Sequence, residues 1–469
     1  MPPPVASLFC AVLIAGLFWL DRDRKARTSI ALWLPAIWVG LACSRGLSLW
    51  LQIDSAESAE QIMEGNPVDR LVFTGLLAVA LIVLASRRQR VVAILRVNAP
   101  VLLFFAYCVI SLLWSDYPEV AFKRWIKALG DLAMVLIVLT DYDPSAAFKR
   151  LLARTSYILI PVSILLIKYY PELGMLYDPW TGKAQYVGVT THKTNLGEIC
   201  LCFGVVALWR FLTAWKDHEL SGRTRQLVAQ GAILAMAAWL FSHANSMTSL
   251  NCFLMAVIVL VGSSFWKAIR RPAVLQLVIA AMLAVSISVL FLGIGEAALA
   301  MMGKDPTLTD RTQVWGIVRS LDHNPLVGTG FESFWLGPRL EKLWSVYWWH
   351  PNQAHNGYLE IFLNLGWVGV ALLGFVLVRG YQAVIAAYRR NLPMANLRVA
   401  LFVVGIVYNF TEAAFFRMLS PAWIFFLFAI VTCPALTRTE VVPIAPSLSD
   451  RSQPLDHELV ASTWTEELV

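Results

Sequence analysis

Two short groups of residues have the clearest chemical potential in this sequence, and about forty residues separate them. The first runs from Asp310 to Trp315 and the second from His355 to Glu360. Both lie in a polar, aromatic-rich stretch, 295–356, of a chain that is otherwise largely apolar. A short connection between membrane helices does not need the arginine, histidine and tryptophan side chains found there. Since cations bind anions such as phosphate and histidine moves protons, we expect the chemistry in this stretch.

The first group is predicted to sit on a short helix, Arg311–Leu321. Arg311, Trp315 and Arg319 recur at every fourth position and therefore share one helix face. A guanidinium next to a tryptophan suits a phosphate that is attached to a sugar or a lipid.

The second group precedes the next apolar run, and Asn356 or Gly357 is its predicted cap. Asn356, Glu360 and Asn364 form a polar stripe down this helix, which a lipid-facing helix would not carry. An isolated histidine is more often structural than catalytic. His355, however, lies just before the start of a membrane helix and opposite several cations, and this position favours a catalytic role.

The composition excludes an ordinary soluble protein. Hydrophobic residues make up 58% of the 469 positions and charged residues 15%, with a mean hydropathy of +0.63. We recognise about thirteen apolar runs and predict an all-α polytopic membrane protein with about 12–13 transmembrane helices and one large outer loop. The first run, Val5–Leu20, could instead be a cleaved signal peptide. We favour a retained anchor, because no small-residue cleavage site follows it.

Basic residues concentrate in alternate connections between these runs. The positive-inside rule places those connections in the cytoplasm and the 295–356 loop outside. The chain then divides into N-terminal membrane helices (1–294), the large outer loop (295–356), C-terminal membrane helices (357–436) and a disordered cytoplasmic tail (437–469). The net charge of +7 reflects this topology and does not indicate nucleic-acid binding.

Further polar residues are predicted to lie on the outer side. Arg124 and its neighbouring lysines lie at the start of one helix. They could bind an anion, or they could simply anchor the helix at the membrane interface. The loop before Leu196 carries His192 and Lys193 at a helix start, where Lys193 could bind an anion or the loop could merely cap the helix. Glu412 and Arg417 lie by the last outer turn, where Glu412 could pair with an outer cation.

The seven cysteines all lie in apolar runs, so we assign them packing roles. They have no metal-ligand spacing with a histidine, and no metal or other cofactor is predicted.

These motifs together resemble the superfamily of O-antigen ligases and O-antigen polymerases, particularly exopolysaccharide polymerases of the succinoglycan type. The likeness covers roughly Asp116 to Pro434. It is carried by the following segments: Leu308–Trp315, Pro325–Phe334, His355–Glu360 with Gly366 and Gly369, Gly188–Lys193 and Asn409–Glu412. Two departures stand out: Asp310 replaces the usual glycine before the loop arginine, and Met247 replaces a cation that many ligases carry.

The resemblance implies a membrane glycosyltransferase of the bacterial inner membrane that works at its outer, periplasmic face. Its donor would be an oligosaccharide on a polyprenyl diphosphate, and its acceptor a glycan or the lipid-A core. Transfer would invert the configuration at the anomeric carbon of the donor sugar, and it would need neither a metal nor a nucleotide sugar. Chain-length regulators or export proteins are further expected partners.

Within this reaction, a diphosphate leaving group needs positive charge and an acceptor hydroxyl needs a base. The predicted catalytic residues are His355 as base and Arg311. The predicted donor-diphosphate ligands are Arg124, Lys193 and Arg319, and the predicted supporting residues are His192, Asn356, Glu360 and Glu412, with Asn356 or Glu360 orienting His355.

Three functions remain open from the sequence. They are a glycosyltransferase (polymerase or ligase), an exporter of lipid-linked glycans, and a non-catalytic subunit of a polysaccharide secretion complex. An exporter would need charges that continue into the inner half of the bilayer, and few are visible there.

Overall fold

The computed structural model describes residues 1–23, 26–53, 65–177, 182–291, 308–321, 323–347, 350–392 and 394–434. For 289–291 and 308–312 it describes the backbone alone. The predicted tail, 437–469, therefore lies outside the described residues. Residues 1–437 group into one compact unit, so the predicted boundaries at 294/295 and 356/357 fall inside that unit.

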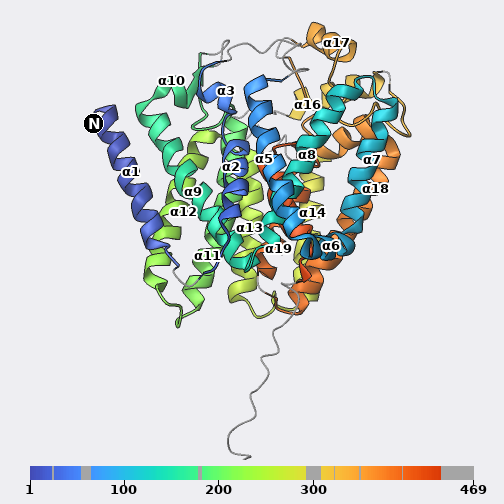
Figure 1. Cartoon of the computed structure of the whole chain (residues 1–469). Helices are drawn as coiled ribbons and strands as arrows, with labels where there is room; N and C mark the ends of the chain where they lie inside the picture. Colours follow the sequence, from blue (N-terminus) through green and yellow to red (C-terminus); the bar gives the residue numbers. More distant parts are fainter. Residues whose placement is uncertain are drawn as a thin grey trace, which may run out of the picture. The chain divides into compact units, whose positions relative to one another are not determined.

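The described part of the chain is almost entirely helical, which confirms the predicted all-α class (Figure 1). Its two strands, β1 (Met175–Tyr177) and β2 (Ala184–Tyr186), form one antiparallel pair. The helices are α1 (Pro3–Leu20), η1 (Ile30–Leu32), α2 (Trp33–Ala42), α3 (Leu47–Trp50), α5 (Pro67–Ser86), α6 (Arg88–Val97), α7 (Ala99–Ile110), η2 (Ser111–Trp114), α8 (Pro118–Leu139), α9 (Pro144–Tyr169), α10 (Pro171–Gly174), α11 (Lys193–Lys216), α12 (Arg223–Ala244), α13 (Met247–Phe265), α14 (Pro272–Phe291), α16 (Leu308–Ser320), α17 (Pro338–Val346), α18 (Gly357–Arg389), α19 (Ala395–Tyr408) and α20 (Pro421–Ile430).

Seven of the described helices are long and apolar enough to cross a membrane: α1, α5, α9, α11, α12, α13 and α18. An eighth span results if α6 and the α7–η2 helix, which meet at a 90° bend, count as one. The other predicted spans are also helical. They correspond to the shorter apolar helices α2 with η1, α14, α19 and α20, and to α8, whose first turns carry Lys123, Arg124 and Lys127. Length and composition alone thus support fewer spans than the 12–13 predicted.

The helices of the compact unit run between two ends. We call the end with α10, α16 and α17 the loop face, and the end with α6 and the α11–α12 connection the basic face (Figure 1). Arg88, Arg223 and Arg389 lie at the basic-face ends of α6, α12 and α18. Three of the basic connections that were predicted to share one side of the membrane thus lie at one end of this unit.

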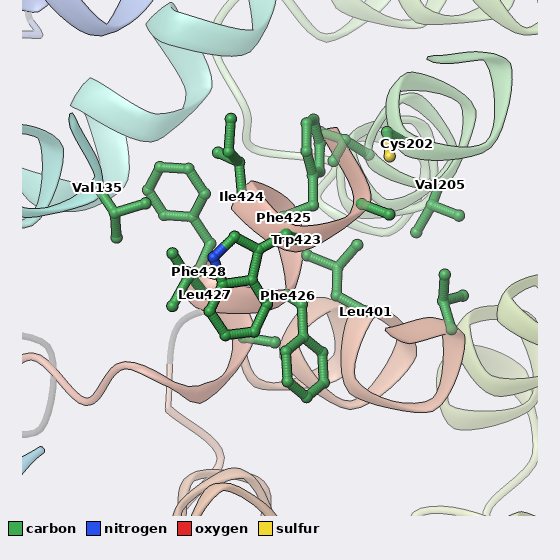
Figure 2. Close-up of a cluster of buried hydrophobic side chains, with 14 of the residues drawn as sticks. Val135, Cys202, Val205, Leu401, Trp423, Ile424, Phe425, Phe426, Leu427 and Phe428 are labelled. Atoms are coloured by element: carbon green, nitrogen blue, oxygen red, sulfur yellow. The ribbon is translucent and has the colours of Figure 1, made fainter. Parts of the chain in front are cut away.

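Helix α20 lies in the interior of the helical unit. All ten of its residues are buried, and Figure 2 shows Trp423 to Phe428 lying among side chains of α8, α11 and α19. At about 1.5 Å per residue, α20 spans only about 15 Å, half of a bilayer core. It is a core helix, and its apolar character on all sides reflects protein packing.

Helix α18 is broken at Gly366, and a segment of the outer loop fills the break. Gly366 has φ +63° and ψ −165°, which is not helical. The amides of Trp367 and Val368 donate to the carbonyls of Pro325 and Leu326 at 2.9 and 3.1 Å. Backbone groups that lose their helical partners at membrane depth need such replacements.

The glycines of the loop motif permit this insertion. A Cβ on Gly328 would lie 2.3 Å from the backbone of Asn364, and a Cβ on Gly366 would lie 2.3 Å from the backbone of Leu326. Both residues also have positive φ. The loop and the helix approach each other this closely because neither glycine has a side chain.

The outer loop has a small hydrophobic core of its own. Val314 and Val318 of α16 and Leu340 and Leu343 of α17 pack in one buried cluster with Leu363 of α18. This cluster attaches the two loop helices to the membrane helices.

Candidate functional site

His355 and Glu412 form the central contact of the loop face. The Nδ1 atom of His355 lies 3.0 Å from Oε2 of Glu412. The His355 side chain is 24% exposed and that of Glu412 is 9% exposed. When Glu412 is ionised it accepts a hydrogen bond from Nδ1–H, which leaves Nε2 as the ring nitrogen that can take a proton. A histidine oriented by a carboxylate is the usual arrangement of a general base.

The backbone around this pair is fixed by two of the sequence motifs. The Gly357 amide donates to the carbonyls of Asn409 (2.8 Å) and Glu412 (3.0 Å). A Cβ on Gly357 would lie 2.0 Å from Oδ1 of Asn409. His355 itself has φ +50°, a strained value for a residue other than glycine. Such conformations persist where the surrounding contacts over-determine them, and they are frequent at functional sites.

The polar stripe of α18 anchors the outer loop. Asn356 caps the helix by accepting from Tyr358 and Leu359, as the sequence predicted. Glu360 accepts hydrogen bonds from Trp335 Nε1 and from the Ala354 amide. The carboxylate that contacts His355 is therefore Glu412, and not Glu360 as expected from the sequence.

Asn364, the last member of this stripe, holds the next part of the loop. Its Oδ1 accepts from the amides of Ser333 and Phe334 at 2.9 and 3.1 Å. Ser333 also lies 2.7 Å from the hydroxyl of Ser115, which links the loop to the turn before α8.

His192 and Lys193 begin α11 beside the His355–Glu412 pair. The side chain of His192 caps the helix by accepting from the Thr194 amide. His192 keeps access to solvent, but protein surrounds one side of its ring. This desolvation lowers its pKa, and the nearby Lys193 and His355 lower it further, while Glu412 acts in the opposite direction.

Arg45 holds the loop that presents Lys193. Its guanidinium donates to the carbonyls of Thr190 and Gly188, both at 3.1 Å, and to that of Leu173. It also lies over the ring of Trp50. Burial lowers the pKa of Arg45. These partners mark Arg45 as a positioning residue.

Arg417 is a second cation at the loop face, and the sequence had placed it only near the last outer turn. Its Nη1 donates to Oε1 of Gln353, two residues before His355. Phe416 and Leu419, on either side of it, both have positive φ.

Two buried carboxylates hold the Arg417 turn in this shape. Asp131 of α8 accepts from the Leu419 amide at 3.0 Å. Glu198 of α11 accepts from the Ala422 amide at 2.9 Å and from the Ser420 hydroxyl at 3.2 Å. The signal that could have found Arg417 is this pair of carboxylates inside apolar helices, since buried charges need partners.

The remaining predicted cations are placed differently. Arg124 donates from Nη1 to the Glu332 carbonyl at 2.6 Å, and the same atom lies 3.9 Å from the Glu332 carboxylate. Arg319 is exposed on α16. The backbone of Arg311 lies in α16 as predicted, while its side chain is outside the described residues. Trp315 of α16 donates to the Ala354 carbonyl, one residue before His355.

Fold and site together define a multi-pass α-helical membrane protein with a histidine–carboxylate pair among cations at one face. Residues 230–374 match the family model described as O-Antigen ligase. The chain is also similar to the Exopolysaccharide production protein ExoQ of Rhizobium meliloti (strain 1021), with 24% identity over 290 residues. That match covers 59% of this chain and 63% of the relative, so it spans less than two thirds of the relative's length. Both matches are thus similarities to proteins of O-antigen and exopolysaccharide production.

Proposed function

We propose that the protein is a glycosyltransferase that joins polyprenyl-diphosphate-linked glycan units at the outer face of the bacterial inner membrane. The observation that carries the proposal is the 3.0 Å contact between His355 Nδ1 and Glu412. It leaves Nε2 of a partly exposed imidazole as a base, within a group of cations. The match of 230–374 to the O-antigen ligase model includes His355 and Arg311 but ends before Glu412.

The proposed reaction is a single displacement. His355 takes the proton of an acceptor hydroxyl, the hydroxyl oxygen bonds to the anomeric carbon of the donor, and the bond from that carbon to the diphosphate oxygen breaks. One displacement inverts the anomeric configuration. The leaving lipid diphosphate gains negative charge, and we assign its stabilisation to Lys193 and Arg417, together with the predicted ligands Arg311, Arg124 and Arg319.

The acceptor is proposed to be a second glycan unit, so that the product is a growing exopolysaccharide. The name of the similar Rhizobium protein supports polysaccharide production over attachment to a lipid-A core. The exporter alternative receives no support from the buried charges of the basic face. Arg210 is paired with Asp21 at 2.6 Å, and Arg398 donates to the carbonyl of Ala429 at 2.8 Å.

A reconstituted assay with a lipid-linked repeat unit tests the proposal, with bound donor and product scored separately. His355→Ala is expected to retain donor binding and to lower transfer by about 10²–10⁴-fold. His218→Ala, an exposed histidine between α11 and α12, is the matched control and should transfer normally. A His355→Ala protein that transfers at the wild-type rate contradicts the mechanism.

Glycans from a deletion strain separate polymerisation from ligation. Accumulated single repeat units indicate a polymerase, and accumulated long lipid-linked chains indicate a ligase.

A further inference from the structure

A groove at the basic face carries two arginines that have no part in the proposed reaction. It consists of two hollows, of about 600 and 240 Å³, where α6 and α7 meet α18. Val97 and Pro100 of the α6–α7 bend and Arg379 of α18 line both hollows. Arg96 of α6 lines the larger one. We call the two hollows together the bend groove.

The bend groove exists because the chain turns sharply at the basic face. Helices α6 and α7 meet at 90°, and α6 lies at the basic-face end of the helical unit (Figure 1). Asn98 holds the bend by donating to the carbonyls of Ile94 and Thr432 at 2.7 and 2.9 Å. Since α7 packs against α18, the two arginines come from neighbouring parts of the fold.

Helix α6 has the residue pattern of a helix that lies in a membrane interface. Ile94 is buried, and Val91 and Leu95 pack against the same core. Arg88 and Arg96 are exposed, and their spacing of eight residues places them on one face of the helix. A helix with an apolar face and arginines on another face is attracted to anionic lipids.

Described carboxylates do not balance the charge at the bend groove. Helices α6, α7, α19 and α20 contain no aspartate or glutamate, and α18 contains none after Gly366. Within the described ranges neither Arg96 nor Arg379 forms an ion pair. Arg379 donates to Oε1 of Gln382 at 3.1 Å, so its charge is not neutralised there.

The tail after α20 is the competing source of negative charge. Thr432, close to its start, lines the smaller hollow. Residues 435–469 lie outside the described structure and carry two arginines and six carboxylates: Glu440, Asp450, Asp456, Glu458, Glu466 and Glu467. A chain with a neutral tail is therefore one arm of the experiment.

The remaining lining of the larger hollow is apolar and extends from the arginines along the membrane helices. Phe375 lies one helical turn before Arg379, and Leu103 and Ala106 lie one and two turns beyond the start of α7. Leu103 and Phe375 are 49% and 45% exposed. Two cations at one end of an exposed apolar groove fit a phosphate at the membrane surface with a hydrocarbon chain attached to it.

We propose that the bend groove binds an anionic phospholipid of the leaflet at the basic face. Arg96 and Arg379 hold the phosphate, and the apolar walls from α7 and α18 hold an acyl chain. The site lies at the end of the helical unit opposite to His355, and it does not rest on the proposed function.

Lipid titration of the purified full-length chain in detergent tests the site, with bound lipids counted by native mass spectrometry. Phosphatidylglycerol is the anionic probe, and phosphatidylcholine with the same acyl chains is the zwitterionic comparison. The first phosphatidylglycerol is expected to bind about tenfold more tightly than the first phosphatidylcholine, because two arginines attract its net charge. Glycerol 3-phosphate should not compete, and displacement of the lipid by it would overturn the assignment to a phospholipid.

Substitutions assign this preference to the groove. Arg96→Gln with Arg379→Gln should lower the affinity for phosphatidylglycerol to that for phosphatidylcholine. Arg96→Lys with Arg379→Lys keeps the charges and should retain most of the preference, which separates lost charge from misfolding. Arg389→Gln with Arg390→Gln removes equal charge from the exposed end of α18 and should bind like the parent. Equal losses for the two glutamine pairs would mean general attraction to the basic face and would refute the site.

Two further proteins separate the groove from the donor site and from the tail. Lys193→Gln should weaken donor binding but keep the preference for phosphatidylglycerol, whereas the Arg96 and Arg379 glutamine pair should do the reverse. A full-length chain whose six tail carboxylates are replaced by amides should bind phosphatidylglycerol like the parent. The proposal is overturned if the parent shows no preference, if Lys193→Gln removes it, or if only the chain with the neutral tail shows it.

Discussion

At the scale of single residues, the role of His355 depends on the charge of Glu412. Glu412→Gln keeps the size of the side chain but removes that charge, and its amide can also hold the ring in the wrong tautomer. Transfer is expected to fall, by up to about 10⁴-fold if the general base is lost entirely, while donor binding stays. The reconstituted transfer assay measures both, and Glu341→Gln on α17 is the control. Equal rates for Glu412→Gln and the parent would show that the 3.0 Å contact is structural.

Arg417 offers a test of geometry at constant charge. Arg417→Lys keeps the positive charge but loses the planar guanidinium that reaches Gln353. Donor affinity is expected to weaken about tenfold, the effect of about one charge-assisted hydrogen bond. Arg389→Lys on the basic face serves as the control in the same binding measurement. An unchanged affinity for Arg417→Lys would remove Arg417 from the donor site.

The lowered pKa of His192 predicts that the stability of the protein depends on pH. Its pKa is lowered from an ordinary value of 6.5, so below that value the unfolded chain binds more protons than the folded one. Stability is therefore expected to rise with pH through this window and to be lost on acidification. Thermal unfolding at pH 7.5 and 5.5 measures the loss. His192→Gln, whose amide oxygen can still cap α11, should lose less thermal stability on acidification than the parent. Equal losses of stability would contradict this role of His192.

The residues of the site were predictable by type, but their pairing was not. His355, Glu412, Lys193 and Asn356 stand out in the sequence because polar groups at the mouth of an apolar helix are costly. The contact between His355 and Glu412 joins positions 57 residues apart, whereas the sequence prediction named the nearer Asn356 or Glu360 as the residue that orients His355. Only the folded chain shows that Glu360 is occupied by Trp335 and Ala354.

At the scale of elements, the break in α18 makes Gly366 a sensitive position. A Cβ there would meet the backbone of Leu326 at 2.3 Å in a positive-φ conformation. Gly366→Ala is expected to destabilise the protein by at least about 1–3 kcal/mol, from backbone strain alone. Gly374→Ala, eight residues further along α18, has open space around it and is expected to be neutral or stabilising by up to about 1 kcal/mol. Thermal unfolding of the two variants in detergent compares them, and equal midpoints would contradict the insertion of the loop.

The helices themselves were predictable because long apolar runs form helices in a membrane. Every predicted run overlaps at least one described helix, and the short loop helix is present as α16. The sequence did not predict α6 as a separate helix at 90° to the next, nor the break at Gly366. Both features depend on contacts with distant segments, whereas hydropathy reports only local composition.

At the scale of the whole molecule, the orientation in the membrane can be tested with introduced cysteines. The seven native cysteines are all buried and should not react with a water-soluble thiol reagent. Ser345→Cys on α17 is expected to react with an impermeant thiol reagent in spheroplasts, while Ser221→Cys between α11 and α12 should not. Both serines are exposed, unlike Ser333, which is buried and hydrogen-bonded to Ser115 in the turn before α8. The reverse labelling pattern would place the loop face in the cytoplasm and exclude a periplasmic reaction.

The loop segment in the break of α18 also has a consequence for biogenesis. The segment at 324–330 precedes α18 in the chain, so it leaves the ribosome before the helix that needs it. When α18 enters the bilayer, the carbonyl partners for Trp367 and Val368 have already been synthesised and need not wait for later helices. The order of synthesis thus shortens the time during which the amides of the broken helix face lipid unpaired. For the same reason the loop is not a separable module: an excised soluble loop would lose the α18 backbone that completes its own hydrogen bonds.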